Sequence, residues 1–193
     1  MTNFSDKPII LASQSPRRKL LLEWAEIVFE VMVKETDESY PKDMASTDVP
    51  VFIARNKVLA LEATGNLSNK IIIAADTIVL LGNDIIGKPR DRADAVSILS
   101  RISGKTHKVI TGVVCRLNDQ EIAFSDTTEV AFHDLLPEEI DFYVDHYHPY
   151  DKAGAYAIQE WIGVIGIKSI TGDFYNVMGL PVSRVVKALQ HFR

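Results

Sequence analysis

The segment from Ser13 to Arg18 combines hydroxyl and guanidinium groups at a point that reads as the start of a helix. Ser15 is a favoured N-cap residue, and Pro16 suits the first helical position, where its missing N–H costs nothing. A helix N-terminus offers unpaired N–H donors and the positive end of the helix dipole, and guanidinium groups match the geometry of phosphate oxygens. The segment is therefore a candidate phosphate-binding site, and a capped helix with exposed arginines is the alternative.

A single carboxylate, Asp76, interrupts the strongly apolar segment 71–81. Burying a charge among apolar side chains costs on the order of several kcal/mol unless the charge is paired or binds a metal. The pattern favours a functional role for Asp76, and a buried structural salt bridge is the alternative.

Three further segments could contact a ligand, although each also has a structural explanation. Lys88 lies in a Gly-Lys-Pro sequence that, taken alone, is typical of a turn with a solvated lysine. The small residues between Asp151 and Gln159 permit close approach by a ligand or by the backbone in a tightly packed bend. The segment 176–181 reads as a turn that begins a helix.

Several familiar motifs are absent or have the wrong spacing. No Gly-x-Gly-x-x-Gly fingerprint occurs, and the segment 163–169 does not match a phosphate-binding P-loop. The Asp-His-Tyr-His sequence at 145–148 has a metal cluster as one interpretation, and a solvated turn before Pro149 is the favoured one. Cys115 lies in an apolar strand pattern and is predicted to be a core residue.

The elements that must position these residues form an alternating series. Hydrophobic periodicity predicts helices at 15–24, 48–63, 91–102, 137–146 and from 181 onward. It predicts strands at 8–13, 27–33, 71–81, 107–117, 122–133 and 162–170. Interleaved strands and helices, together with the hairpin around residues 118–119, predict an α/β fold with a mixed central sheet flanked by helices.

Composition and charge narrow the class of protein further. The 193 residues suit about one domain, which we place at 1–193. With 47% hydrophobic and 24% charged residues the chain has a globular composition, which excludes disorder and fibrous repeats. The net charge of −5 argues against a nucleic acid polymer as partner. Because the N-terminus lacks a hydrophobic leader and segment 71–81 is too short to span a bilayer, we expect a cytoplasmic protein with no membrane partner.

Six short motifs, taken together, resemble the Maf family of nucleoside triphosphate pyrophosphatases, the septum-formation-inhibitor-like proteins. They are Ser13-x-Ser15-Pro16-Arg17-Arg18, Ala75-Asp76-Thr77, Gly87-Lys88-Pro89, Ser103-Gly104-x-x-His107, Ala153-Gly154-Ala155-Tyr156 and Gly179-Leu180-Pro181. Each motif alone is weak, but all of them occur in family order over nearly the whole chain. The resemblance implies a Maf/ITPase-like fold, elongated with a cleft.

The resemblance also implies a reaction, the hydrolysis of a nucleoside triphosphate to the monophosphate and pyrophosphate. It marks Asp76 as the proton acceptor that activates water. The residues expected to bind phosphate are Ser13, Arg17, Arg18, Lys57 and Lys88. A divalent cation, Mg²⁺ or Mn²⁺, is expected to bridge phosphate oxygens and carboxylates, and among Glu35, Asp37 and Glu38 we favour Glu38 as the partner of Asp76 in that site. An open alternative is that Asp76 orients a metal-bound water.

The segment 153–159 looks like the family branch that acts on dTTP and UTP, and this resemblance marks Arg17, Thr77 and Gln159 as specificity positions. The amide of Gln159 has donors and an acceptor that can pair with N3–H and a carbonyl of uracil or thymine, an edge that cytosine reverses. House-cleaning of the nucleotide pool and a homodimer are expected by resemblance. Two alternative functions remain, a purine pyrophosphatase of the inosine triphosphate type and a non-catalytic nucleotide-binding regulator of cell division.

Overall fold

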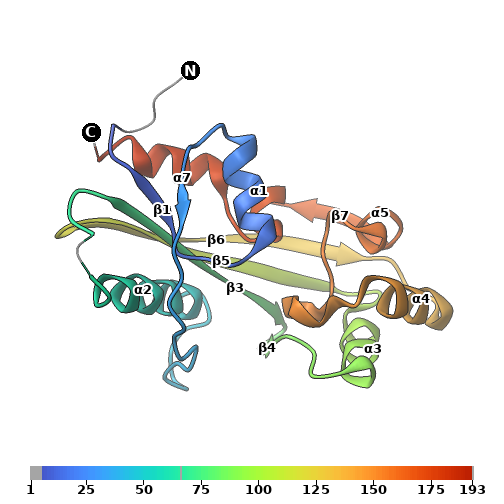
Figure 1. Ribbon diagram of the computed structural model, residues 1–193. Helices are drawn as coiled ribbons and strands as arrows, with labels where there is room; N and C mark the ends of the chain where they lie inside the picture. The colour runs from blue at the N-terminus through green and yellow to red at the C-terminus, as the bar shows by residue number, and fades with distance from the viewer. Residues whose placement is uncertain (1–5, 66, 193) are drawn as a thin grey trace. The chain divides into compact units, whose positions relative to one another are not determined.

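The computed structural model describes residues 6–65 and 67–192, and its chain divides into two compact units (Figure 1). Unit 1 consists of the described residues within Met1–Asp76, Thr111–Asp126 and Gly179–Arg193. Unit 2 consists of Thr77–Ile110 and Thr127–Met178. The single domain over residues 1–193 stays a prediction.

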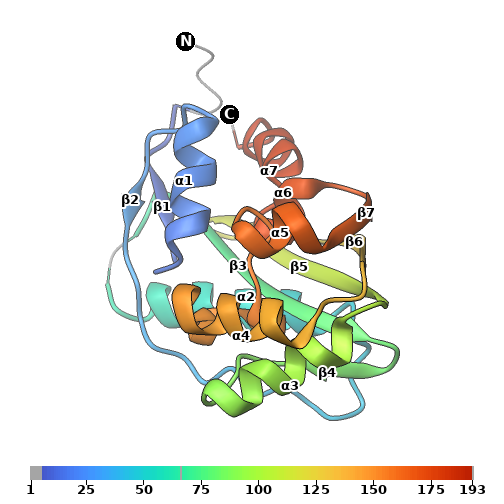
Figure 2. The ribbon, with the colours of Figure 1, turned by 90° about the vertical axis from the view of Figure 1, so that its right-hand side faces the viewer.

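Unit 1 has helices on both faces of its strands (Figure 1, Figure 2). Its elements include β1 (Ile9–Leu11), α1 (Pro16–Trp24), β2 (Glu30–Val31), α2 (Val49–Glu62) and α7 (Val182–Leu189). In both ribbon views α2 lies on one face of the strands of this unit, and α1 and α7 lie on the other (Figure 1, Figure 2). Buried apolar residues join α2 to the strands; they are Ile10, Ala12, Ala54, Val58, Leu61, Ile72, Ala74 and Val114. This packing fixes the helix that carries Lys57.

The register between β1 and β3 (Ile71–Leu81) places two predicted site residues near one another along the sheet. The strands are parallel, and Leu11 is the partner of Ile73. The N–H of Ala12 continues the pairing by donating to the carbonyl of Ile73 over 2.8 Å. Because the two strands run in the same direction, Ser13 and Asp76 both follow these paired residues, Ser13 just beyond the end of β1 and Asp76 within β3.

Unit 2 contains the remaining elements. They are β4 (Asp84–Ile86), α3 (Arg92–Ile102), α4 (Pro137–Tyr147), the short turns η1 (Pro149–Asp151) and η2 (Ala153–Ala155), α5 (Trp161–Gly166), β7 (Ile167–Thr171) and α6 (Phe174–Met178). The long strands β3, β5 (Thr106–Leu117) and β6 (Gln120–Phe132) each contribute residues to both units. Among the described residues the strands form a seven-stranded sheet of order β2-β1-β3-β5-β6-β7, with β4 paired to β3. Its parallel and antiparallel pairs confirm the predicted mixed α/β fold.

Local signals in the sequence account for the helix ends. The Oγ of Ser15 accepts from the N–H of Arg18, as an N-cap should. The carboxylate of Asp91 does the same for Asp94 over 2.8 Å at the start of α3. Beyond the end of that helix, Gly104 has a φ of +68°. A residue with a side chain would be strained in this backbone conformation, so glycine is favoured here.

The strand predicted over 162–170 is wrong, because the first part of this segment is the helix α5 and only Ile167–Thr171 is extended. Its β-branched residues fit a strand pattern, but the backbone folds back on itself at Gly163. A Cβ there would lie 1.8 Å from the carbonyl oxygen of Ile158. The carbonyl of Glu160 accepts from the N–H of Gly163 over 2.9 Å, which closes a helical turn. Close backbone contacts within residues 158–163 therefore override β propensity at this point.

Among the described residues, no helix combines the length and the apolar character that crossing a membrane requires.

Cys115 is fully buried, as predicted, and burial raises the pKa of its thiol to about 12, so it stays protonated at neutral pH.

Candidate active site

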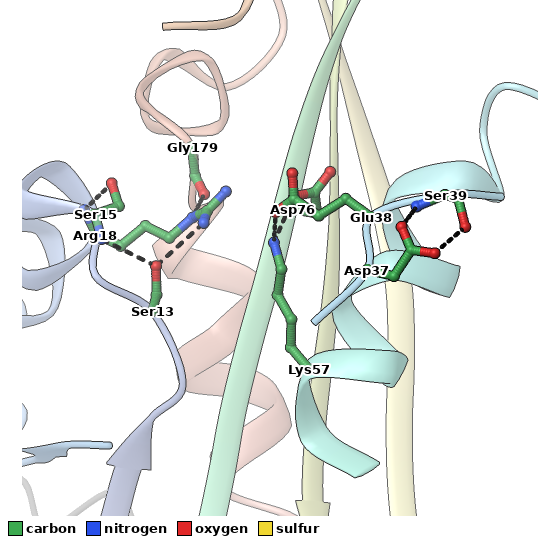
Figure 3. A network of polar contacts seen from close by, with 9 residues as sticks. All are labelled: Ser13, Ser15, Arg18, Asp37, Glu38, Ser39, Lys57, Asp76 and Gly179. Carbon is green, nitrogen blue, oxygen red and sulfur yellow. Dashed lines mark hydrogen bonds and ion pairs between the residues drawn. The ribbon is translucent and has the colours of Figure 1, made fainter. Parts of the chain in front are cut away.

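A buried guanidinium group lies at the start of α1. The Nε of Arg18 donates to the carbonyl oxygen of Gly179 over 2.8 Å, and its Nη1 donates to the Oγ of Ser13 over 3.2 Å (Figure 3). Ser13 and Arg18 are both buried. Three distant parts of the sequence, the end of β1, the first turn of α1 and the Gly-Leu-Pro motif, are thus joined by one side chain.

Electrostatics connect Arg18 to two carboxylates. Burial lowers the pKa of Arg18 below its usual value, while the negative charges of Asp76 and Glu38 raise it and the neighbouring Arg17 lowers it further. An arginine keeps its charge even so, because its ordinary pKa lies above 12. The segment at residues 13–18 therefore holds a fixed, desolvated positive charge, which is the property expected of a phosphate-binding group.

A lysine and two carboxylates form a second group in unit 1. The Nζ of Lys57, on α2, lies 2.7 Å from an Oδ1 of Asp76 and 2.9 Å from an Oε1 of Glu38 (Figure 3). The side chains of Lys57 and Asp76 are 15% and 13% exposed, whereas that of Glu38 is 49% exposed. The group is anchored on a helix and a strand and reaches solvent through a loop residue.

The acidic loop distinguishes Glu38 from its neighbour. Asp37 accepts hydrogen bonds from the N–H of Ser39 over 2.9 Å and from its hydroxyl over 2.6 Å, and these bonds lower the pKa of Asp37 (Figure 3). Asp37 therefore shapes the turn of its own loop. Glu38 instead contacts Lys57, and its role as a metal ligand stays a prediction.

Asp76 is paired, as the apolar surroundings in the sequence required. Its partner, Lys57, is itself one of the predicted phosphate ligands, so the salt bridge and the functional interpretation involve the same residues. The pair continues to a half-exposed glutamate, so the group is in contact with solvent.

The residues Thr77, Lys88 and Gln159 belong to unit 2. Thr77 is half-buried, and Lys88 and Gln159 are exposed. The N–H of Gly154 donates to the carbonyl of Gly87 over 3.1 Å, which ties the loop of Lys88 to the loop that leads to Gln159. Gly154 has a φ of +73°, and a Cβ there would lie 2.9 Å from a methyl carbon of Val79, so glycine is required at this junction.

Oxygen ligands for a divalent cation are present at the lysine–carboxylate group. Asp76 and Glu38 converge on one ammonium, and carboxylate oxygens are the donors that Mg²⁺ and Mn²⁺ prefer. The described residues contain no group of three or more His, Cys, Asp or Glu that could hold a metal by itself. The donor set fits a cation that takes its other ligands from substrate phosphates and water.

The Asp-His-Tyr-His segment has another role. Asp145 forms an ion pair with Arg92 over 2.6 Å, and the ring of His146 hydrogen-bonds the carbonyl of Phe142. Both residues are exposed near the end of α4. The exposure agrees with the predicted solvated segment before Pro149, although most of it is the last turn of α4 and not a separate turn.

Sequence reasoning did not identify Tyr143, which contacts the loop of Gln159. Tyr143, on α4, donates a short hydrogen bond to a carboxylate oxygen of Glu160, beside the predicted specificity residue Gln159. Nothing local marks Tyr143, because it sits in the apolar stripe of an ordinary amphipathic helix. Only the tertiary fold brings it to the loop.

Comparison with known proteins agrees with this architecture. The sequence model of the family described as Maf-like protein matches residues 8–192, and the chain belongs to the Maf family. A Parabacteroides distasonis protein named dTTP/UTP pyrophosphatase is 46% identical over 193 residues, which cover 100% of both chains. A Bacteroides thetaiotaomicron protein with the same name is 44% identical over 189 residues, 97% of each chain.

A solved structure shares the fold. The Ham1 protein of Staphylococcus aureus superposes with a TM-score of 0.52 over 97% of this chain and 100% of its own, at 16% sequence identity. The predicted family and the mixed α/β architecture are thus confirmed.

Proposed function

We propose that this chain is a nucleoside triphosphate pyrophosphatase that hydrolyses dTTP and UTP to the monophosphate and pyrophosphate. The observation that carries the proposal is the group formed by Lys57, Asp76 and Glu38, in the same unit as the buried Arg18. Full-length relatives named dTTP/UTP pyrophosphatase support the choice of substrates.

The charges of unit 1 suit a polyanionic substrate. Arg18 is already desolvated and held by Ser13 and Gly179, so it loses little conformational freedom when it meets a phosphate. The ammonium of Lys57 is divided between two carboxylates, and triphosphate oxygens compete for it. With Arg17 of the same unit, these groups neutralise charge that grows on the pyrophosphate leaving group. Family resemblance adds Lys88 to the proposed phosphate-binding residues.

The chemical step is an attack by water on the α-phosphorus. A new bond forms between the water oxygen and that phosphorus, and the bond from the phosphorus to the oxygen that bridges to the β-phosphate breaks. The electron pair of the broken bond leaves with pyrophosphate. Asp76 accepts the proton of the attacking water through a carboxylate oxygen, and Lys57 keeps that carboxylate in place.

A divalent cation, Mg²⁺ or Mn²⁺, would be held by Asp76 and Glu38. When bound, it supplies Lewis-acid polarisation of a phosphate oxygen. Removal of divalent ions with a chelator is expected to abolish pyrophosphate release, and added Mg²⁺ or Mn²⁺ to restore it. Binding of Mn²⁺ measured by electron paramagnetic resonance, in wild type and in Glu38→Gln, tests the ligand set without recourse to activity.

The residue proposed to recognise the nucleobase is Gln159, which belongs to unit 2. Gln159 is exposed and offers the amide edge that complements uracil and thymine. Family resemblance marks Thr77 and Arg17 as the other specificity positions. A mismatched amide against cytosine is expected to cost about 1–3 kcal/mol, a preference of roughly ten- to a hundredfold.

The test is kcat/KM for dTTP, UTP, CTP, ITP and 7-methyl-GTP, measured as pyrophosphate release. We expect dTTP and UTP to be the best substrates by about tenfold or more. A preference for ITP would identify a purine pyrophosphatase. Binding of UTP without product would identify a non-catalytic nucleotide-binding regulator, and either result contradicts the proposal.

We also propose a cytoplasmic homodimer that removes dTTP and UTP from the nucleotide pool. Family resemblance supports it. Light scattering coupled to size exclusion measures the oligomeric state, and a mass of one chain contradicts the dimer.

A further inference from the structure

The turn that carries Gln159 has an exposed tip on a buried base. Residues 155–158 are buried and Gln159 is exposed. The N–H of Glu160 donates to the carbonyl of Ala157 over 3.1 Å, so Ile158 and Gln159 form the two central positions of a turn. An exposed amide can discriminate between bases only if its backbone holds it in one place.

One buried phenol spans this turn. The hydroxyl of Tyr143 accepts from the N–H of Ala157 over 3.1 Å and donates its proton to the carboxylate of Glu160. A phenol has one proton to donate and lone pairs to accept with, so both bonds form together. Tyr143 is completely buried. Its single oxygen therefore fixes the residues that flank the tip of the turn on both sides.

A lysine holds the far side of the same carboxylate. The Nζ of Lys152 lies 3.6 Å from an Oε1 of Glu160 and 2.8 Å from an Oδ1 of Asp151. The side chain of Lys152 is only 9% exposed. Glu160 thus meets a phenol through one oxygen and an ammonium through the other, which fixes its orientation.

The start of the turn is anchored as well. The hydroxyl of Tyr156 lies 2.7 Å from the Nε2 of His107, and both side chains are buried. Their rings pack edge to face with centroids 5.4 Å apart. The polypeptide is therefore held immediately before Ala157 and at Glu160, and Gln159 lies between the two anchors.

We propose that Tyr143, Glu160 and Lys152 are positioning residues for base selection, which act by fixing the turn that presents Gln159. This inference rests on the proposed function, because it assigns the turn to the reading of uracil and thymine. The three residues are not expected to touch the phosphates or the reacting atoms. Their loss should therefore change KM and the UTP/CTP preference, and leave kcat on UTP nearly unchanged.

The decisive variant is Tyr143→Phe, which keeps the ring and removes the oxygen that binds both Ala157 and Glu160. We expect KM for UTP to rise about tenfold, the UTP/CTP preference to fall by a similar factor, and kcat to stay within about twofold. Tyr147→Phe is the matched control. It removes a phenol oxygen one turn along the same helix, from a ring that stacks on Tyr143 at 5.0 Å, and should change none of these quantities.

A second pair of variants keeps the test decisive if Tyr143→Phe folds poorly. Glu160→Gln retains an oxygen that accepts from the phenol and should keep most of the UTP/CTP preference, whereas Glu160→Ala should lose it. Hydrogen exchange at the amide of Ala157 should accelerate in Tyr143→Phe and Glu160→Ala, and not in Tyr147→Phe.

The outcomes separate this inference from the proposed function. A wild-type protein that prefers UTP over CTP, with Tyr143→Phe and Glu160→Ala retaining that preference in full, overturns the positioning role alone. A wild-type protein that releases no pyrophosphate from UTP or dTTP overturns the proposed function and this inference with it. A fall in kcat with unchanged KM would place these residues in the chemical step and would also overturn it.

Discussion

Two lysines, one in each compact unit, each hold a pair of carboxylates, and their surroundings differ. Lys57 contacts Asp76 at 2.7 Å and Glu38 at 2.9 Å, and Glu38 is half-exposed. Lys152 contacts Asp151 at 2.8 Å but lies 3.6 Å from Glu160, whose carboxylate is bonded to the buried phenol of Tyr143. The first group can exchange its partners for a charged ligand.

The second group is tied into the backbone of a turn and serves to hold geometry. We therefore expect ion pairs of similar composition to have different roles according to what else binds the carboxylates. A salt bridge whose acid also binds a buried phenol resists exchange, because a ligand would have to replace both contacts. The predictions below test this contrast.

The largest effect is expected at Asp76. Asp76→Asn keeps the shape of the side chain and removes its charge and basicity, so kcat should fall about a hundredfold or more, the usual contribution of a general base. The melting temperature should change little, because Lys57 retains Glu38 as a partner. Pyrophosphate release and thermal melting measure the two quantities, and a variant with most of its turnover would remove Asp76 from the mechanism.

The two lysines themselves provide a matched pair. Lys57→Met should lower kcat for UTP between about tenfold and a hundredfold, since a charge-assisted hydrogen bond contributes roughly 1.5–3 kcal/mol. Lys152→Met should lower the free energy of unfolding by about 2 kcal/mol and leave kcat within about threefold. Urea denaturation and steady-state kinetics on both variants test the contrast, and it fails if the two variants behave alike.

The acidic loop offers a second matched pair. Glu38→Gln should raise the Mg²⁺ concentration needed for half-maximal activity about tenfold, because one carboxylate ligand is lost. Asp37→Asn should leave that concentration within about twofold, since the carboxylate of Asp37 accepts hydrogen bonds from Ser39 within its own turn. Mg²⁺ titrations of both variants are the measurement, and equal shifts would argue against a specific role for Glu38.

The smallest effect is expected from the titration of His107, which should change stability with pH. Burial lowers the pKa of His107 to about 4, against an ordinary value of 6.5. Between these values the unfolded chain binds more protons than the folded one, so stability is complete above about pH 6.5 and falls as the pH drops towards 4. The loss amounts to at most about 3 kcal/mol.

Replacement of His107 by leucine removes the titrating group. Plots of unfolding free energy against pH should therefore be flatter for His107→Leu than for the wild type between pH 4 and 6.5. Parallel curves for the two proteins would show that His107 does not titrate in this range.

Much of this architecture follows from local signals. The capping serine and the proline after it predicted the start of α1, and the apolar run with one carboxylate predicted β3 with its bounds Ile71–Leu81. Asp76 was recognisable because a buried charge needs a partner. Lys57 and Glu38 entered through family resemblance, since a lysine in a helix and a glutamate in an acidic loop carry no signal of their own.

The features that sequence reasoning missed depend on backbone and side-chain contacts that hydrophobic periodicity does not report. The segment 162–170 satisfied a strand pattern, and its first half became α5 because Gly163 packs on the carbonyl of Ile158. The carbonyl of Gly179 binds Arg18 across 161 positions of sequence, and Tyr143 meets Glu160 across 17. No periodicity in a single chain encodes such pairs.

The most direct test of the account is hydrolysis of UTP in water enriched in ¹⁸O, followed by mass spectrometry of both products. Attack at the α-phosphorus by the water that Asp76 activates places the heavy oxygen in UMP and leaves pyrophosphate unlabelled. The same label pattern should appear, at a much lower rate, with Asp76→Asn. Heavy oxygen in pyrophosphate, or release of inorganic phosphate and UDP, would contradict the proposed reaction.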